Sequence, residues 1–203
     1  MFTPFFQRNK RSFSVSRQPD KRTAILLATL KLIAERGFHG TPTSMIAERA
    51  GVGVGTIYRY FKDKDQLIHT LYEELEAKNK AFVYQGYEEE RPVLDRFQHL
   101  CRNIYRYLLA NPLEFRFLEQ YFDSPYGVAK MRQKLDSAGE PFHALLKEGK
   151  RQGLVKDMPP TLLFGLIFGP MINVIKDHDS GLLKLDEVLL ERLIEATWDA
   201  IKK

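Results

Sequence analysis

The sequence predicts an all-α protein in which an N-terminal, three-helix helix-turn-helix domain is joined by a connecting helix to a C-terminal helical bundle. Three observations lead to this prediction. Apolar residues recur three and four positions apart along most of the chain. Proline and glycine divide these stretches into helices of ordinary length, without the alternating pattern of strands. Residues 43–64 contain two short helical patterns around a glycine turn.

Charge is unevenly distributed along the chain. Residues 1–65 hold 12 Lys and Arg against 5 Asp and Glu, whereas residues 66–203 hold 19 against 21. This asymmetry is expected when one end of a protein meets phosphates. The single cysteine, Cys101, excludes an intrachain disulfide and fits a reducing cytoplasm. The longest apolar run, residues 162–175, is too short to span a membrane.

Residues 1–18 show no helical or strand period, and we expect a disordered basic arm. Such an arm either adds DNA contacts or is simply a solvated tail, and the sequence leaves both open. The first helix opens at Pro19 and Asp20 and runs to about Arg36. Gly37 ends it.

The glycine turn joins two short helices. Thr43 is expected to cap the first helix, which stops at Gly51 because glycine takes a positive φ at low cost. The second helix, residues 54–61, turns Ile57 and Phe61 inward. Its outer surface then carries small residues, one hydroxyl, two phenols and a guanidinium: Val54, Gly55, Thr56, Tyr58, Arg59 and Tyr60.

This outer surface suits a DNA major groove. Small residues allow close approach, hydroxyl groups reach phosphates, and arginine reads guanine or clamps a phosphate. Asp63 and Gln66 are expected to form a capping box that starts the next helix, leaving the Lys64 ammonium free for a phosphate. We expect phosphate contacts from Thr43, Tyr58, Tyr60 and Lys64. We expect base-edge contacts from Ser44, Val54, Gly55, Thr56 and Arg59.

A nucleotide-binding loop is the rival interpretation of the glycines at positions 51, 53 and 55. A dinucleotide fingerprint follows a β-strand, whereas a helical pattern precedes Gly51. The DNA-binding interpretation is therefore favoured.

The motif resembles a known family. Residues 50–67 read AGVGVGTIYRYFKDKDQL, and they are preceded by TSMIA and by ERGFHGTPT. Together these segments closely resemble the N-terminal DNA-binding domain of TetR-type bacterial transcriptional regulators, over about residues 20–71. The resemblance implies that the last two helices pack with their copies as a four-helix dimer interface.

Residues 19–81 are thus predicted to be the DNA-binding domain, and residues 82–203 a ligand-binding and dimerisation domain. A leucine stripe makes residues 63–82 the connecting helix between them. Further helices are predicted at residues 93–110, 112–122, 126–152 with a break near 139–141, 160–177 and 186–201. Gly165 and Gly169, four positions apart, would allow close contact between helices.

Several aromatic residues of the second domain could line a pocket for a flat or apolar effector, although packing in a plain core is the alternative. The candidates are Tyr105, Phe117, Tyr121, Phe164, Phe168 and Asn173. The five histidines form no pair at a spacing of four, and the nearest approach to a metal site, residues 177–179, is expected to cap a helix instead. No enzyme motif and no cofactor site is predicted.

The sequence therefore predicts a homodimeric, ligand-responsive transcriptional regulator that represses by occupying a palindromic operator on double-stranded DNA. A small-molecule effector between the helices of the second domain would tilt the connecting helix and change the spacing of the two DNA-binding domains. The alternative is a constitutive dimeric DNA-binding or architectural protein without an effector, which predicts a solid core and little sequence preference.

Overall fold

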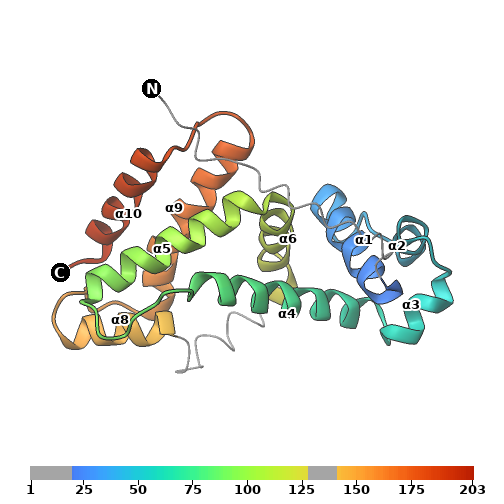
Figure 1. Cartoon of the computed structure of the whole chain (residues 1–203), viewed down its shortest axis with the longest axis horizontal. Coiled ribbons are helices and arrows are strands. Elements are labelled where there is room, and N and C mark those ends of the chain that lie inside the picture. Colours follow the sequence, from blue (N-terminus) through green and yellow to red (C-terminus); the bar gives the residue numbers. More distant parts are fainter. Residues whose placement is uncertain (1–19, 128–140) are drawn as a thin grey trace.

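The computed structural model describes residues 20–127 and 141–203, and it confirms the all-α architecture. In Figure 1 the long helix α4 joins α1, α2 and α3 at one end to α5, α8, α9 and α10 at the other, with α6 between the two groups. The helices are α1 (Lys21–Arg36), α2 (Thr43–Ala50), α3 (Val54–Tyr60), α4 (Lys64–Val83), α5 (Val93–Ala110), α6 (Pro112–Phe122), α8 (Pro141–Arg151), α9 (Pro160–Asp179) and α10 (Glu187–Ile201). Within the described ranges, the β-structure is one isolated bridge, Val155 to Lys202.

Short polar side chains and glycines set the helix boundaries, as the sequence predicted. Asp20 caps α1 by accepting the Thr23 N–H at 2.9 Å, and Asp186 caps α10 by accepting the Leu189 N–H at 2.8 Å. Gly37 ends α1 with φ 70°, a conformation that a side chain would strain.

The expectation that Thr43 caps α2 was wrong. Pro42 occupies the cap position with an extended backbone (φ −68°, ψ 154°), and the cap makes no side-chain hydrogen bond. Thr43 is therefore the first helical residue. The fixed φ of proline and its extended ψ already supply the geometry that a cap residue needs, which moves the start of the helix by one position.

The N-terminal core contains more than the DNA-binding helices. Phe117 and Tyr121 of α6, both almost fully buried, belong to the same hydrophobic cluster as α1, α2, α3 and the first half of α4. The Tyr121 ring stacks on Tyr72 of α4 with centroids 4.1 Å apart. Helix α6, expected within the second domain, is thus packed into the core of the first.

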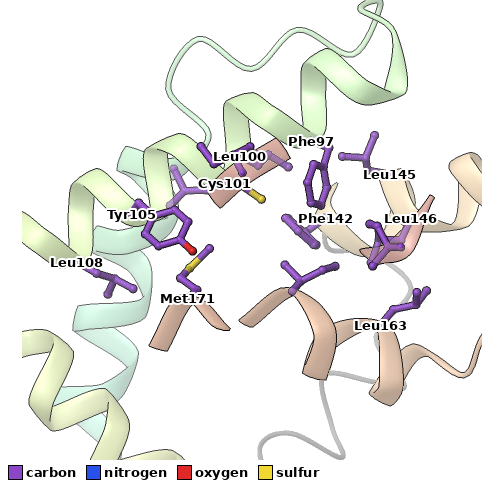
Figure 2. Packing of buried hydrophobic residues seen from close by; sticks show 14 of the residues in the cluster. Phe97, Leu100, Cys101, Tyr105, Leu108, Phe142, Leu145, Leu146, Leu163 and Met171 are labelled. Atoms are coloured by element: carbon purple, nitrogen blue, oxygen red, sulfur yellow. The ribbon is translucent and has the colours of Figure 1, made fainter. Parts of the chain in front are cut away.

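The C-terminal core is formed by α5, α8, α9 and α10 (Figure 2). Helix α5 contributes Phe97, Leu100, Cys101 and Tyr105, and α9 faces it with Leu163, Ile167, Met171 and Ile175. An ion pair links α10 to α5: the Arg102 guanidinium donates two hydrogen bonds to the Glu191 carboxylate, at 2.5 and 2.7 Å. Hydrogen bonding to Arg102 is the main reason that the pKa of Glu191 lies below its ordinary value.

The predicted arm at residues 1–18 lies outside the described residues, and so does most of the first part of the helix expected at 126–152. The second part is present as α8. In the two described ranges, no helix combines the length and the apolar character needed to cross a bilayer.

Candidate nucleic-acid interface

Two buried side chains fix the orientation of α3. Ile57 and Phe61 are 1% and 2% exposed, so the inner side of the helix is held in the N-terminal core as predicted. The opposite side faces outward: Tyr58 is 51% exposed and Tyr60 47%, and Arg59 is exposed as well.

The turn before α3 needs glycine at one position and leaves the others open. Gly51 ends α2 in the left-handed region (φ 67°), and its N–H donates to Ala47 and Glu48 carbonyls. An added Cβ at Gly53 or Gly55 would meet no atom within 4 Å. The small size of Gly55 is therefore not needed by the described fold, and it leaves room for a partner at the start of α3.

A reciprocal cap fixes the start of α4, which the sequence predicted in outline. Asp63 Oδ1 accepts the Gln66 N–H at 2.8 Å. Gln66 Oε1 accepts in return from the N–H of Lys62, at 2.5 Å, rather than from that of Asp63. Lys62 is exposed directly after α3 and is a cation that the sequence interpretation missed; its place beside the cap was the available signal.

Lys64 is not free as expected. Its Nζ donates to the Phe38 carbonyl at 2.7 Å, bridging the start of α4 to the loop after α1, and burial lowers its pKa. An ammonium group has three donors, so the bond to Phe38 still allows a phosphate contact. Part of the role of Lys64 is nevertheless to hold the domain together.

Arg59 and Lys62 differ from Arg22 and Arg49, which also lie in this domain, in having no acidic partner among the described residues. Arg49 is paired with Glu35 at 3.2 Å, and Arg22 with Glu74 at 2.6 Å. Over the described residues, Arg59 has no such acidic partner. The remaining candidates behave as follows: Ser44 and Val54 are exposed, whereas Thr43 and Thr56 are half-buried. None of the nine predicted DNA-contacting residues is buried, and six of them belong to α3.

The six candidate pocket residues do not form one site. Phe117 and Tyr121 lie in the N-terminal core, while Tyr105, Phe164 and Phe168 belong to the C-terminal core. Asn173 is exposed on α9, opposite the side that carries Ile167 and Met171. The helical spacing of the aromatics was compatible with one pocket, but it cannot tell which of two neighbouring cores a helix enters.

A polar hollow of about 150 Å³ lies at the start of α5, and none of the six candidates lines it. Its walls include Tyr87, Arg91, Arg96 and His99. The described residues contain no cluster of three or more metal-ligating side chains. At the end of α9, His178 Nδ1 accepts the Leu185 N–H at 3.2 Å and Asp179 pairs with Arg116 at 2.6 Å, so both stabilise the loop and the helix contact.

Two family models match this chain. Residues 25–71 match the model described as bacterial regulatory proteins, tetR family, and residues 92–202 match the tetracyclin repressor-like C-terminal domain. The first match extends from within α1 to the first part of α4, and the second covers α5, α6, α8, α9 and α10 (Figure 1).

Relatives of known name align over nearly the whole chain. An HTH-type transcriptional regulator of Haemophilus influenzae is 27% identical over 91% of this chain and 97% of its own length. The fatty acid metabolism regulator protein of Bacillus subtilis is 27% identical over 86% and 94%. A TetR-family regulator structure from Vibrio parahaemolyticus is 32% identical with a TM-score of 0.73, covering 91% of this chain and 99% of that one.

Proposed function

Because the chain belongs to the TetR family of bacterial transcriptional regulators, we propose that it occupies a palindromic operator as a homodimer, acts as a repressor, and is released by a small-molecule effector. Proteins of this family bind DNA and are not enzymes. The observation that carries the proposal is the outward side of α3, where Tyr58, Arg59 and Tyr60 are exposed while Ile57 and Phe61 anchor the helix.

In this proposal Tyr58, Tyr60, Lys62 and Lys64 contact phosphates beside the groove. Arg59 and the open start of α3, with Ser44 of α2, face base edges. Phosphate contacts supply affinity that depends on salt, whereas hydrogen bonds to base edges supply sequence preference. Gly55 allows the helix backbone to approach the groove closely.

An uncovered apolar surface supports the homodimer. The α9 side opposite the core carries Leu162, Gly165, Gly169 and Asn173 at helical spacing, and Leu162 is 49% exposed. Two further large apolar side chains are exposed after this helix: Leu182 is 82% exposed and Val188 is 64% exposed. We call this surface, from Leu162 to Asn173 of α9 with Leu182 and Val188, the α9–α10 face.

The two glycines of the α9–α10 face make a second copy the natural occupant. An added Cβ at Gly165 or at Gly169 would meet nothing within 4 Å among the described residues. Glycine inside a helix costs about 1 kcal/mol relative to alanine, so two without a packing role in their own chain need another reason. Close approach of α9 from a second copy of the chain would explain why glycine is present at both positions.

Dimerisation matters because one recognition helix reads only a few base pairs. A two-fold dimer reads two half-sites about 34–36 Å apart, which makes the target both longer and palindromic. An effector that favours one spacing of the two DNA-binding domains then shifts operator affinity, typically by about 1–3 kcal/mol.

Selection of bound duplexes from a random pool, with and without metabolite mixtures, tests the proposal. Enrichment of a palindrome, and its loss with a particular fraction, is the expected result. Binding to the selected palindrome should also weaken steeply with added salt. An enriched site without two-fold symmetry would contradict the homodimer, and a palindrome that every metabolite fraction leaves bound would contradict effector release.

The constitutive alternative also has an observation in its favour. The hollow at the start of α5 is lined mainly by polar residues, and the one beside Pro112, which borders Leu108, Phe115 and Ile175 of the C-terminal core, has a volume of only about 20 Å³. A closed core is what a plain dimerisation domain would have. The alternative predicts weak sequence preference in the same selection, so one experiment separates the two functions.

A further inference from the structure

A buried phenol in the C-terminal core has no hydrogen-bond partner. Tyr105 of α5 is 1% exposed, and its Oη makes no hydrogen bond among the described residues. In Figure 2 the hydroxyl points away from the axis of α5 toward Met171 of α9, into the apolar interior. A buried hydroxyl left without a partner costs about 1–3 kcal/mol.

The same helix shows how a buried phenol is ordinarily accommodated. Tyr107, two positions further along, is 2% exposed, and its hydroxyl donates to Glu114 Oε2 at 2.5 Å. Glu114 is in turn paired with Lys78 at 2.5 Å. Phenylalanine would fill the space of the Tyr105 ring without the unmet hydroxyl, so the hydroxyl itself calls for an explanation.

The surroundings of Tyr105 define what could bind there. The cluster that contains Tyr105 is made of apolar side chains, among them Cys101, Phe142, Ile167 and Met171. Burial raises the pKa of the Tyr105 phenol and of the Cys101 thiol, so both groups are neutral near pH 7. A neutral donor in an apolar setting suits a neutral acceptor.

Among the described residues, this core offers a ligand no permanently charged counter-ion; the ionisable ring that borders it is that of His143, 4.6 Å from the ring of Phe164. The buried charged side chains of the described chain are Arg96 and Glu114. Arg96 pairs with Glu148 at 2.7 Å, and Glu114 with Lys78. A carboxylate would thus be desolvated without a permanent positive charge beside it, whereas an uncharged carbonyl oxygen would gain the phenol as donor.

We propose that Tyr105 is the polar anchor of the effector site: its hydroxyl donates to an uncharged carbonyl oxygen of an otherwise apolar effector that inserts between α5, α8 and α9. This inference rests on the proposed function, which supplies the effector. The stacked rings of Phe164 and Phe168, with centroids 5.5 Å apart, and Phe142, 5.5 Å from Phe168, form an aromatic wall on the same cluster.

The first test measures thermal unfolding of the full-length protein without ligand. Tyr105→Phe removes a hydroxyl that has no partner, so its melting temperature should equal or exceed that of the parent. Tyr107→Phe is the matched control on the same helix and should melt about 2–6 °C lower, because its hydroxyl is hydrogen-bonded. If Tyr105→Phe melts several degrees below the parent, its hydroxyl is satisfied in the free protein and the proposal is overturned.

The second test measures binding of matched probes to the parent and to Tyr105→Phe. Acetylnaphthalene and isopropylnaphthalene share a ring and differ in carbonyl oxygen against methyl; methyl nonyl ketone and the corresponding branched alkane form a flexible pair. The single tryptophan, Trp198, lies 5.2 Å from Phe97 of the same core and reports binding by fluorescence. Calorimetry confirms the stoichiometry.

The parent should bind at least one ketone, and Tyr105→Phe should weaken that ketone about three- to tenfold while leaving its hydrocarbon partner unchanged. Naphthoate, the charged analogue, should bind more weakly than acetylnaphthalene. Failure of both ketones to bind, or equal effects of the substitution on ketone and hydrocarbon, overturns the anchor.

Failure of the proposed function would be seen differently. A ketone that binds in a Tyr105-dependent manner but leaves affinity for the selected DNA unchanged would contradict release of DNA by the effector and support the role of Tyr105. A compound that releases DNA and binds Tyr105→Phe as tightly as the parent would support release by an effector and overturn the role of Tyr105.

Discussion

The two hydrophobic cores of this protein differ in how complete they are within one chain. In the N-terminal core the buried hydroxyl groups are satisfied locally: Thr29 donates to the Ile25 carbonyl and Thr41 to the Gly37 carbonyl, each at 2.8 Å. In the C-terminal core, as far as the structure describes the chain, the Tyr105 hydroxyl lacks a partner and one helix, α9, leaves an apolar side uncovered. The N-terminal core therefore satisfies its buried hydroxyl groups with its own residues, whereas the C-terminal core has a hydroxyl group and an apolar surface that a ligand or a second copy of the chain could contact.

This difference matches a division of labour. A complete core fixes the orientation of α3 through Ile57 and Phe61, as the proposed DNA-contacting surface requires. A core with an unmet donor and an open face can respond to an effector or a second copy. The two are connected by α6, since Phe117 lies in the first core and Arg116 and Glu119 pair with Asp179 and Lys176 of α9, at 2.6 and 2.5 Å.

Phe117→Ala should have the largest effect and tests whether α6 belongs to the N-terminal core. The side chain is fully buried, so its removal should lower the free energy of unfolding by about 3–5 kcal/mol. Urea denaturation measures the loss. Hydrogen exchange should rise in α1 and α4, because their packing against α6 is lost.

The matched control is Phe168→Ala, which removes the same aromatic volume from the C-terminal core. Phe168 is half-buried, so a smaller loss is expected, and exchange should rise in α8 and α9 instead. If both substitutions raise exchange equally in α1, the cores are not separate and the comparison between them fails.

Gly169→Arg tests the open side of the second core. An arginine there would place a charge in the proposed dimer interface, which is costly without a partner. We expect a monomer in analytical ultracentrifugation and roughly a hundredfold loss of operator affinity, about 2.7 kcal/mol, since half of the DNA contacts are lost. The fold of the monomer should survive, because a Cβ at this position meets nothing within 4 Å among the described residues and an arginine side chain can extend into solvent.

Ala77→Arg, at an exposed position of α4, is the control for adding the same side chain. It should stay dimeric. A Gly169→Arg protein that is still a dimer would show that the α9–α10 face is covered in some other way, and the homodimer proposal would need a different surface.

Arg59→Ala tests the surface held by the complete core. If Arg59 reads a base edge, operator affinity falls by about 1–3 kcal/mol and the loss is concentrated at one sequence position. Binding to a panel of single-base operator variants measures this. The exposed Arg151 of α8 offers the control, since Arg151→Ala should leave DNA binding unchanged. An equal loss on every operator variant would make Arg59 a phosphate contact.

Local sequence signals predicted the elements of both cores well. The helices α5 and α6 begin and end at the residues expected, because Pro92 and Asn111-Pro112 interrupt the helical pattern sharply. The inward positions of Ile57 and Phe61 followed from their spacing of four, and both are buried. These features depend on residues close together in the chain.

Contacts between distant segments were harder to predict. The bond from Lys64 to the Phe38 carbonyl joins residues 26 positions apart, and no local pattern indicates it. The assignment of Phe117 and Tyr121 to the first core depends on how α6 docks against α1, which periodicity does not encode. The unmet hydroxyl of Tyr105 is likewise visible only when its neighbours are in place.

Glu191→Gln should have the smallest effect and tests how firmly α10 is fixed to the second core. The bond to Arg102 lowers the pKa of Glu191, so the pair stabilises the fold above the ordinary carboxyl pKa of about 4.5 and loses this contribution as the pH falls. Glu191 is partly exposed, so we expect only about 0.2–1 kcal/mol near pH 7. Denaturation at pH 7 and at successively lower pH should show the free energies of unfolding of the parent and the variant converging.

Glu195→Gln, on the exposed side of the same helix, is the control and should have the same free energy of unfolding as the parent at every pH. If the difference in free energy of unfolding between Glu191→Gln and the parent stayed constant down to low pH, packing rather than charge would fix α10. The C-terminal core would then depend less on this ion pair than we infer.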